Sequence, residues 1–390
     1  KNLFSHIIGQ IDDDNNGISG IEKSFDNQLK EINKPLKLTV DLDIQFLIRE
    51  ELIKFQSIFR SKGSTAILMN VNNGEIISMV SYPDFNLNKR QKIDDKNYIN
   101  RATKGVYELG SVFKTFTIAA GLDAGLIEPD TKFLNLKKKL DCGKSTITEY
   151  DNKILSDLTV EEILIKSGNI GSVRIGQMLK IEGLKFFLEK IGVLHKIDFD
   201  IKEVGQPIPF MWGKCKLATV SFGHGITTTP LQLAKAYGII SNGGFDIAPT
   251  LIKNTKKNNK KRVIKKNTSD AINLILRKIV IEGTAKLANV DGYEVGGKTG
   301  TANKSAKGGY SKKKINTFAS IFPTSNPKFA LVVLMEETQI SPDYIYEYRD
   351  GSKFKLKGSP RNTAAWTSVE VAGKIIEKIG PILATKYIEN

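Results

Sequence analysis

Cysteine is scarce in this chain of 390 residues. The two cysteines, Cys142 and Cys215, are too few for a disulfide framework, and no C-x-x-C or Cys/His cluster indicates a structural metal. We therefore expect neither a metal nor a cofactor. The two thiols could be free or could form one bridge, and the sequence leaves both open.

Histidines that could activate a serine nucleophile are equally few. His6 lies in a disordered-looking start and His195 is typical of a helix end, whereas His224 lies in a glycine-rich turn where a substrate contact stays open. No serine has glycines two residues before and two residues after it, so the G-x-S-x-G elbow is absent. The sequence therefore gives no support to a Ser-His-Asp hydrolase.

Long hydrophobic runs are missing as well. No window of about 18 apolar residues exists, so no segment of this sequence is expected to span a membrane. The chain begins at Lys1 rather than Met, and we expect a fragment or processed form whose membrane anchor lay upstream.

Acidic residues are outnumbered by basic ones, 42 against 58, which gives a formal net charge of +16. The excess is mostly lysine, without the aromatic interleaving or the zinc-finger spacing of nucleic-acid binding modules. We expect no nucleic-acid partner and a basic surface that faces an anionic layer or polymer.

The remaining patterns predict an α+β fold. Residues 1–35 are rich in Asp, Asn and Gly and indicate a linker or the remnant of another module, and residues 36–390 form one domain. A helix is predicted from Ile44 to about Phe59, and two β-rich runs within 65–82 meet at a hairpin turn over 72–74. Helical patterns dominate from 111 to about 240, with one helix framed by Thr229, Pro230 and Gly243. A helix over 268–283, strand-like runs at 293–302, 315–323 and 328–337, and a last helix over 364–380 close the chain.

The pattern S-x-x-K occurs four times, beginning at Ser111, Ser311, Ser325 and Ser352. Only Ser111 opens an apolar-periodic helix, on which Lys114 shares its face. A serine hydroxyl needs a nearby base, and a lysine can be that base when burial or a second cation lowers its pKa. The context therefore selects Ser111 as nucleophile and Lys114 as base.

The stretch 292–299, "GYEVGGKT", matches a phosphate-binding P-loop, but no apolar strand precedes it and no helix opens at its end. We interpret it instead as an edge strand with Lys298 and Gly300 on one side and Thr299 and Thr301 on the other. Such a strand can bind an extended peptide substrate. Ser167-x-Asn169 is the only S-x-N in the chain, and it could supply a relay hydroxyl and a substrate-binding amide.

S-x-x-K, S-x-N and K-T-G in this order resemble the motif set of penicillin-binding proteins and serine β-lactamases. Flanking segments such as "NRATKGVYELGSVFK", "SFGHGITTTPLQLAKAYGIISNGG" and "FASIFPTSNPKFALVVLMEE" look like a class B penicillin-binding protein, most like the septal division transpeptidase. The resemblance covers roughly residues 36 to 385. It implies the transpeptidase fold of that family, an antiparallel sheet flanked by helices with a mostly helical subdomain, and makes residues 1–35 a pedestal remnant.

The resemblance also implies roles for individual residues. Ser111 would be acylated by the penultimate D-Ala of a peptidoglycan stem peptide or by a β-lactam, with Lys114 as base. Ser167 and Asn169 would serve proton relay and amide binding. Lys298, Thr299 and Thr301 would bind the terminal carboxylate next to Gly300, and the N–H groups of Ser111 and Thr301 would form the oxyanion hole. Gly168 and the "ELGS" segment, where relatives often have other residues, leave only local geometry open.

The family further implies an inner-membrane protein with a periplasmic catalytic domain, working with a membrane glycosyltransferase and other division proteins. Three alternatives stay open: an elongation-type transpeptidase, a D,D-carboxypeptidase or β-lactamase, and a non-catalytic β-lactam sensor.

Overall fold

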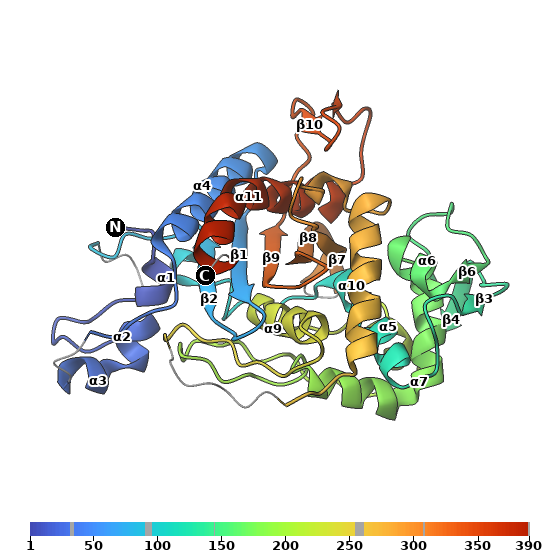
Figure 1. Cartoon of the computed structure of the whole chain (residues 1–390), viewed down its shortest axis with the longest axis horizontal. Helices are drawn as coiled ribbons and strands as arrows, with labels where there is room; N and C mark the ends of the chain where they lie inside the picture. Colours follow the sequence, from blue (N-terminus) through green and yellow to red (C-terminus); the bar gives the residue numbers. More distant parts are fainter. Residues whose placement is uncertain (32–34, 90–95, 144, 254–260, 307–308, 389–390) are drawn as a thin grey trace.

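A five-stranded antiparallel sheet, in the order β2-β1-β9-β8-β7, lies at the centre of the structure (Figure 1). The computed structural model describes residues 1–31, 35–89, 96–143, 145–253, 261–306 and 309–388. The strands are β1 (Gly63–Asn70), β2 (Ile76–Tyr82), β7 (Gly296–Ala306), β8 (Gly309–Phe322) and β9 (Phe329–Glu336). The predicted α+β fold is therefore confirmed, and the sheet joins segments far apart in the sequence.

Helices cover both faces of this sheet. The helices α4 (Leu42–Phe59) and α11 (Ser368–Leu383) pack together on one face, and α9 (Pro230–Ser241) and α10 (Lys266–Ile281) lie on the other (Figure 1). Every residue of the central strand β9 is buried, as its apolar run requires when both faces are covered. The strand β7 has a partner on one side only, which confirms the predicted edge strand.

Local signals in the sequence produce the predicted turns and helix ends. The helix α9 begins with a capping box between Thr229 and Gln232 and has Pro230 at its first position. The strands β1 and β2 form the predicted hairpin, in which Gly74 takes the positive φ of +79°. The stretch that matched a P-loop forms part of the strand β7, so the P-loop interpretation is excluded.

The expectation of a disordered start is wrong for residues 1–31. These residues form the short helices α1 (Ser5–Ile8), α2 (Gly20–Ser24) and α3 (Asp26–Glu31). Ile7 is fully buried, and His6 Nε2 donates a 2.7 Å hydrogen bond to Asn97 O while its ring packs edge-on against Phe85. The few apolar residues in this polar stretch are therefore enough to fix it on the domain, and its origin as a pedestal remnant stays a prediction.

A mostly helical subdomain lies beside the sheet (Figure 1). It contains α5 (Lys114–Asp123), α6 (Val160–Ile165), α7 (Asn169–Lys190) and α8 (Lys214–Val220). Two short strand pairs, which helical periodicity did not predict, also belong to it: β3 (Lys132–Phe133) with β6 (Leu158–Thr159), and β4 (Lys139–Cys142) with β5 (Ser145–Thr148). Cys142 and Cys215 form a disulfide between β4 and α8, which settles the open question of their state. Across the described residues, no helix is both long enough and apolar enough to cross a bilayer.

Candidate active site

Ser111 lies where the helical subdomain meets the edge strand β7. It belongs to the 3₁₀ turn η2 (Gly110–Phe113), which continues directly into α5. This confirms that a helix opens at Gly110-Ser111, with a tighter first turn than the pattern predicted. Lys114 begins α5 and is fully buried.

Two glycines allow this turn to approach the strand closely. A Cβ on Gly300 would lie 2.1 Å from Leu109 O, and a Cβ on Gly110 would lie 2.9 Å from Thr301 O and 3.2 Å from Thr301 N. Gly110 also has a φ of +64°, a conformation that other residues adopt at a cost. The backbone of Thr301 is therefore fixed next to the backbone of Ser111.

The hydroxyl of Ser167 joins two buried lysines. Lys114 Nζ donates to Ser167 Oγ at 3.1 Å and to Ser167 O, and Lys298 Nζ donates to the same Oγ at 2.9 Å. Both lysine side chains are fully buried. The structure thus brings together one residue from each of the three predicted motifs.

Burial lowers the pKa of both lysines. The pKa of Lys114 falls from 10.5 to about 7 because burial disfavours its ammonium form, and the carboxylate of Glu149 opposes this only in part. The pKa of Lys298 lies well below its usual range because of burial and of the nearby Lys114. The sequence predicted that burial or a second cation would lower the pKa of Lys114, and burial is the cause that lowers it.

Ser167 owes its position to a break between two helices. Its φ of +58° ends α6, and α7 begins at Asn169 after Gly168. Such a conformation in a non-glycine residue often marks a functional site. Asn169 Nδ2 donates to Thr148 O at 2.7 Å, while Glu149 accepts the backbone N–H groups of Asn169 and Ile170 at 2.7 and 2.9 Å. Glu149 therefore caps α7 and fixes the second motif.

The expected alternation along β7 is present. Lys298 and Gly300 face the nucleophile turn, whereas Thr299 and Thr301 face outward and line a cavity. Thr299 Oγ1 lies 2.9 Å from Thr284 Oγ1, and Thr301 Oγ1 accepts the N–H of Ala364 at 2.9 Å.

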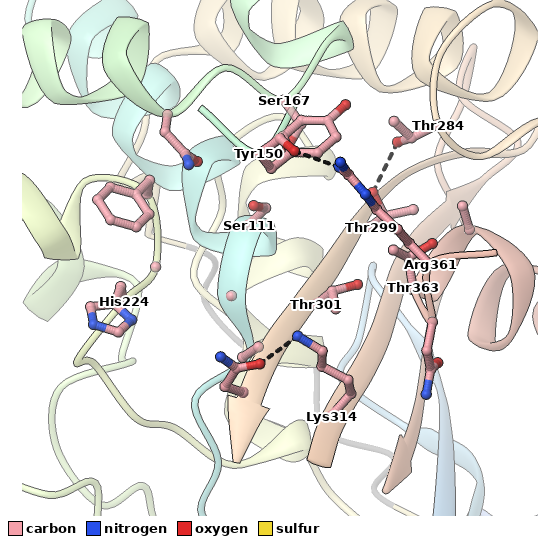
Figure 2. Close-up of a pocket in the computed structure, with 18 of the residues that line it drawn as sticks. Ser111, Tyr150, Ser167, His224, Thr284, Thr299, Thr301, Lys314, Arg361 and Thr363 are labelled. Atoms are coloured by element: carbon pink, nitrogen blue, oxygen red, sulfur yellow. Dashed lines mark hydrogen bonds between the residues drawn. The ribbon is translucent and has the colours of Figure 1, made fainter. Parts of the chain in front are cut away.

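This cavity of about 590 Å³ opens over Ser111 (Figure 2). Its lining includes the predicted Ser111, Ser167, Asn169, Thr299 and Thr301, but neither buried lysine. It also contains side chains that the motifs did not reveal: Tyr150, Phe222, Thr284, Asn303, Tyr310, Lys314, Arg361, Asn362 and Thr363. Asn303, Tyr310 and Lys314 come from β7 and β8, and the others come from loops and turns. Phe222 lies in a segment that the family resemblance marked, and the others carry no motif in this sequence.

The three histidines lie in different surroundings, and one of them lines the cavity. His224 lines the cavity, with its ring 4.9 Å from that of Tyr310 and Nδ1 3.7 Å from Glu108 Oε2. His195 is a surface residue after α7, and burial lowers the pKa of His6 to about 4. Neither of these two lines the cavity over Ser111.

The geometry suits attack by a serine hydroxyl on a carbonyl carbon. Ser111 stands one turn from a buried lysine that is neutral in a large fraction of molecules near pH 7. Ser167 connects that lysine to a second one, and the close backbones of Ser111 and Thr301 can donate N–H groups to a developing oxyanion.

Comparisons with known proteins agree with this chemistry. A family model described as the penicillin binding protein transpeptidase domain matches residues 64–354. The probable peptidoglycan D,D-transpeptidase FtsI of Caulobacter vibrioides is 30% identical over 400 residues, 98% of this chain and 65% of that protein. The probable peptidoglycan D,D-transpeptidase PenA of Neisseria flavescens is 31% identical over 317 residues, 80% of this chain and 78% of that protein. The TP domain of Burkholderia pseudomallei penicillin-binding protein 3 matches with a TM-score of 0.75 and 26% identity, covering 90% of this chain and 96% of that one.

Proposed function

Because the chain belongs to the penicillin-binding protein transpeptidase family, we propose that it is a peptidoglycan D,D-transpeptidase of the class B, septal type. It spans 65% of the Caulobacter relative's length, and its similarity to that D,D-transpeptidase and to the Neisseria one supports this activity. Stem peptides ending in D-Ala-D-Ala are the donor, and β-lactams acylate the same serine.

The reaction has two halves, acylation of Ser111 and transfer of the acyl group to an amine, and both use the residues around Ser111. Ser111 Oγ transfers its proton to neutral Lys114 and bonds to the carbonyl carbon of the penultimate D-Ala. The N–H groups of Ser111 and Thr301 stabilise the oxyanion, and the C–N bond to the terminal D-Ala breaks as its amine takes a proton through Ser167. The amine of a second stem peptide then attacks the ester and passes a proton through Lys114 to Ser111 Oγ, which leaves as the free hydroxyl as the cross-link forms.

This proposal rests on one observation: the Ser167 hydroxyl accepts hydrogen bonds from both Lys114 and Lys298. Burial and the nearby Lys114 lower the pKa of Lys298, and burial lowers the pKa of Lys114 to about 7, which leaves a base for Ser111. Asn169 and the outward hydroxyls of Thr299 and Thr301 are proposed to bind the donor's amide and carboxylate, beside Gly300.

The proposal extends to the cellular setting. We place the domain in the periplasm, on a single-pass anchor in the inner membrane outside these residues, next to a membrane glycosyltransferase and other division proteins. The net charge of +16 is consistent with a surface near anionic lipid or wall polymer.

Incubation with benzylpenicillin, followed by intact-mass measurement of wild type and Ser111→Ala, tests the proposal. Wild type gains the mass of one penicillin for many minutes and Ser111→Ala gains none. Labelling that survives this substitution would refute Ser111 as the nucleophile.

The same adduct separates the alternatives. A rapid return to the free mass indicates a β-lactamase, and stable acylation without turnover of a thioester donor and an amine acceptor indicates a sensor. Release of free acid from that donor without transfer to the amine indicates a carboxypeptidase. Side-wall rather than septal localisation of the full-length protein indicates the elongation type.

A further inference from the structure

Arg361 reaches over the cavity from a segment that is fixed to the sheet. This segment follows the small hairpin of β10 (Tyr346–Glu347) and β11 (Lys353–Phe354). The next residue, Asn362, accepts hydrogen bonds from Asn316 Nδ2 at 2.8 Å and Thr338 Oγ1 at 2.9 Å. Ala364 N donates to Thr301 Oγ1 at 2.9 Å. The backbone around Arg361 therefore has a set position relative to the strand that holds Thr299 and Thr301.

The side chain of Arg361 crosses the cavity mouth toward the second motif. Its Nη1 donates to Tyr150 O at 2.6 Å (Figure 2). The Tyr150 hydroxyl in turn donates to the backbone oxygen of Lys166, the residue before Ser167. Arg361 and Thr299 line the same cavity. The guanidinium therefore shares the cavity with Ser167 and Thr299 and contacts the segment that is hydrogen-bonded to the residue before Ser167.

The charge of Arg361 is left without a counter-ion. Within the described residues its hydrogen-bond partner is a neutral carbonyl, and no carboxylate lies within ion-pair distance. A guanidinium has five N–H donors, so the bond to Tyr150 leaves a fork free for a bidentate anion. By contrast, Lys304 of β7 and Lys313 of β8 both contact the carboxylate of Glu337.

Lys298 does not present its charge to the cavity. It is fully buried and does not line the cavity, and its Nζ donates hydrogen bonds to Ser167 Oγ and Thr299 O. Burial and Lys114 also keep its pKa well below the usual range. A carboxylate at the Thr299 hydroxyl therefore needs a permanent cation from elsewhere.

We propose that Arg361 is a substrate-binding residue that pairs with the terminal carboxylate of the acyl donor, and with the matching carboxylate of a β-lactam. This inference rests on the proposed transpeptidase function. The other lining cation, Lys314, donates to Asn303 Oδ1, beyond Thr301 along β7, and so lies toward the acyl side of a bound peptide. The carboxylates of Glu149 and Glu108 are engaged by the N–H groups of Asn169, Ile170 and Gly225 and by the Tyr310 hydroxyl.

A matched pair of ligands tests this role. Second-order acylation rates are measured by intact mass with benzylpenicillin and with its methyl ester, which lacks the carboxylate charge. Arg361→Gln lowers the rate with the acid about tenfold and leaves the rate with the ester within about twofold, as expected for loss of one charge-assisted contact. Arg361→Lys, which keeps the charge without the fork, falls between wild type and Arg361→Gln.

The pH dependence adds a second readout. In wild type the preference for the acid over the ester stays flat as pH rises, because a guanidinium remains charged. In Arg361→Gln the preference stays flat as well, at a level about tenfold lower, because the buried Lys298 presents no charge to the cavity.

Arg349→Gln is the control. Arg349 lies in the turn between β10 and β11, pairs with Asp291 and does not line the cavity, so both rates stay at the wild-type value. Equal losses with acid and ester in Arg361→Gln, or no loss with either, would overturn the role of Arg361 alone. A wild-type protein that no penicillin acylates would instead overturn the proposed function, and the role of Arg361 with it.

Discussion

Replacement of Gly110 by alanine tests whether the close approach of the nucleophile turn to β7 creates the oxyanion site. Gly110 has a φ of +64°, and an added Cβ would lie 2.9 Å from Thr301 O and 3.2 Å from Thr301 N. Contacts this short force the Thr301 backbone away from Ser111 by a few tenths of an ångström. Two effects follow: a backbone cost in the folded state and a displaced N–H donor in the site.

Gly125 provides a matched control at the other end of the same helix. It follows α5 and has a φ of +68°, and a Cβ there would meet nothing within 4 Å. Alanine in a left-handed conformation costs about 1–2 kcal/mol at either position. Both variants are therefore expected to lose about that much free energy of unfolding, measured by chemical denaturation.

Acylation separates the two variants. Loss of a whole oxyanion donor costs about 10²–10³ in rate, so a displaced donor in Gly110→Ala is expected to cost at least about tenfold. Gly125→Ala keeps the wild-type acylation rate with benzylpenicillin. Wild-type acylation by Gly110→Ala, or an equal loss in Gly125→Ala, would refute the reasoning.

Three further expectations concern stability and the disulfide. Lys114→Met abolishes acylation but raises the free energy of unfolding at pH 7 by up to a few kcal/mol. The pKa of Lys114 is about 7 in the folded protein and 10.5 in the unfolded chain, so at any pH below 10.5 proton binding favours the unfolded chain. Wild-type stability accordingly rises with pH between those two values, and urea titrations at pH 7 and 10 show a smaller rise for Lys114→Met. Cys142→Ser with Cys215→Ser opens a loop of 73 residues and costs roughly 4 kcal/mol in denaturation experiments. It also slows acylation several-fold, since the bridge joins the segments before Glu149 and His224; an unchanged rate would show that the bridge only stabilises.

The parts of the fold and site that the sequence predicts are those with local or periodic signals. The capping box of α9, the hairpin at Gly74 and the helix that opens at Ser111 each depend on neighbours within a few residues. Their side-chain types fix the backbone, so one sequence suffices to predict them.

Long-range partners were not predictable in the same way. Glu149 caps the helix that begins 20 residues later, and Arg361 meets Tyr150 across 211 residues. The composition of neither segment predicts these contacts, because they depend on how distant loops fold together. The ordered start of the chain was missed for a similar reason, since isolated buried side chains such as Ile7 and Ile21 leave no periodicity.

The dependence of Ser111 acylation on pH is the most direct measurement of the central claim, that a buried and neutral Lys114 acts as base. The second-order rate with benzylpenicillin, followed by intact mass from pH 5 to 9, is expected to rise with pH and level off with an apparent pKa of about 7, because Lys114 accepts a proton only in its neutral form. A rate that is flat over this range, or that is still rising in proportion to hydroxide at pH 9, would contradict the account.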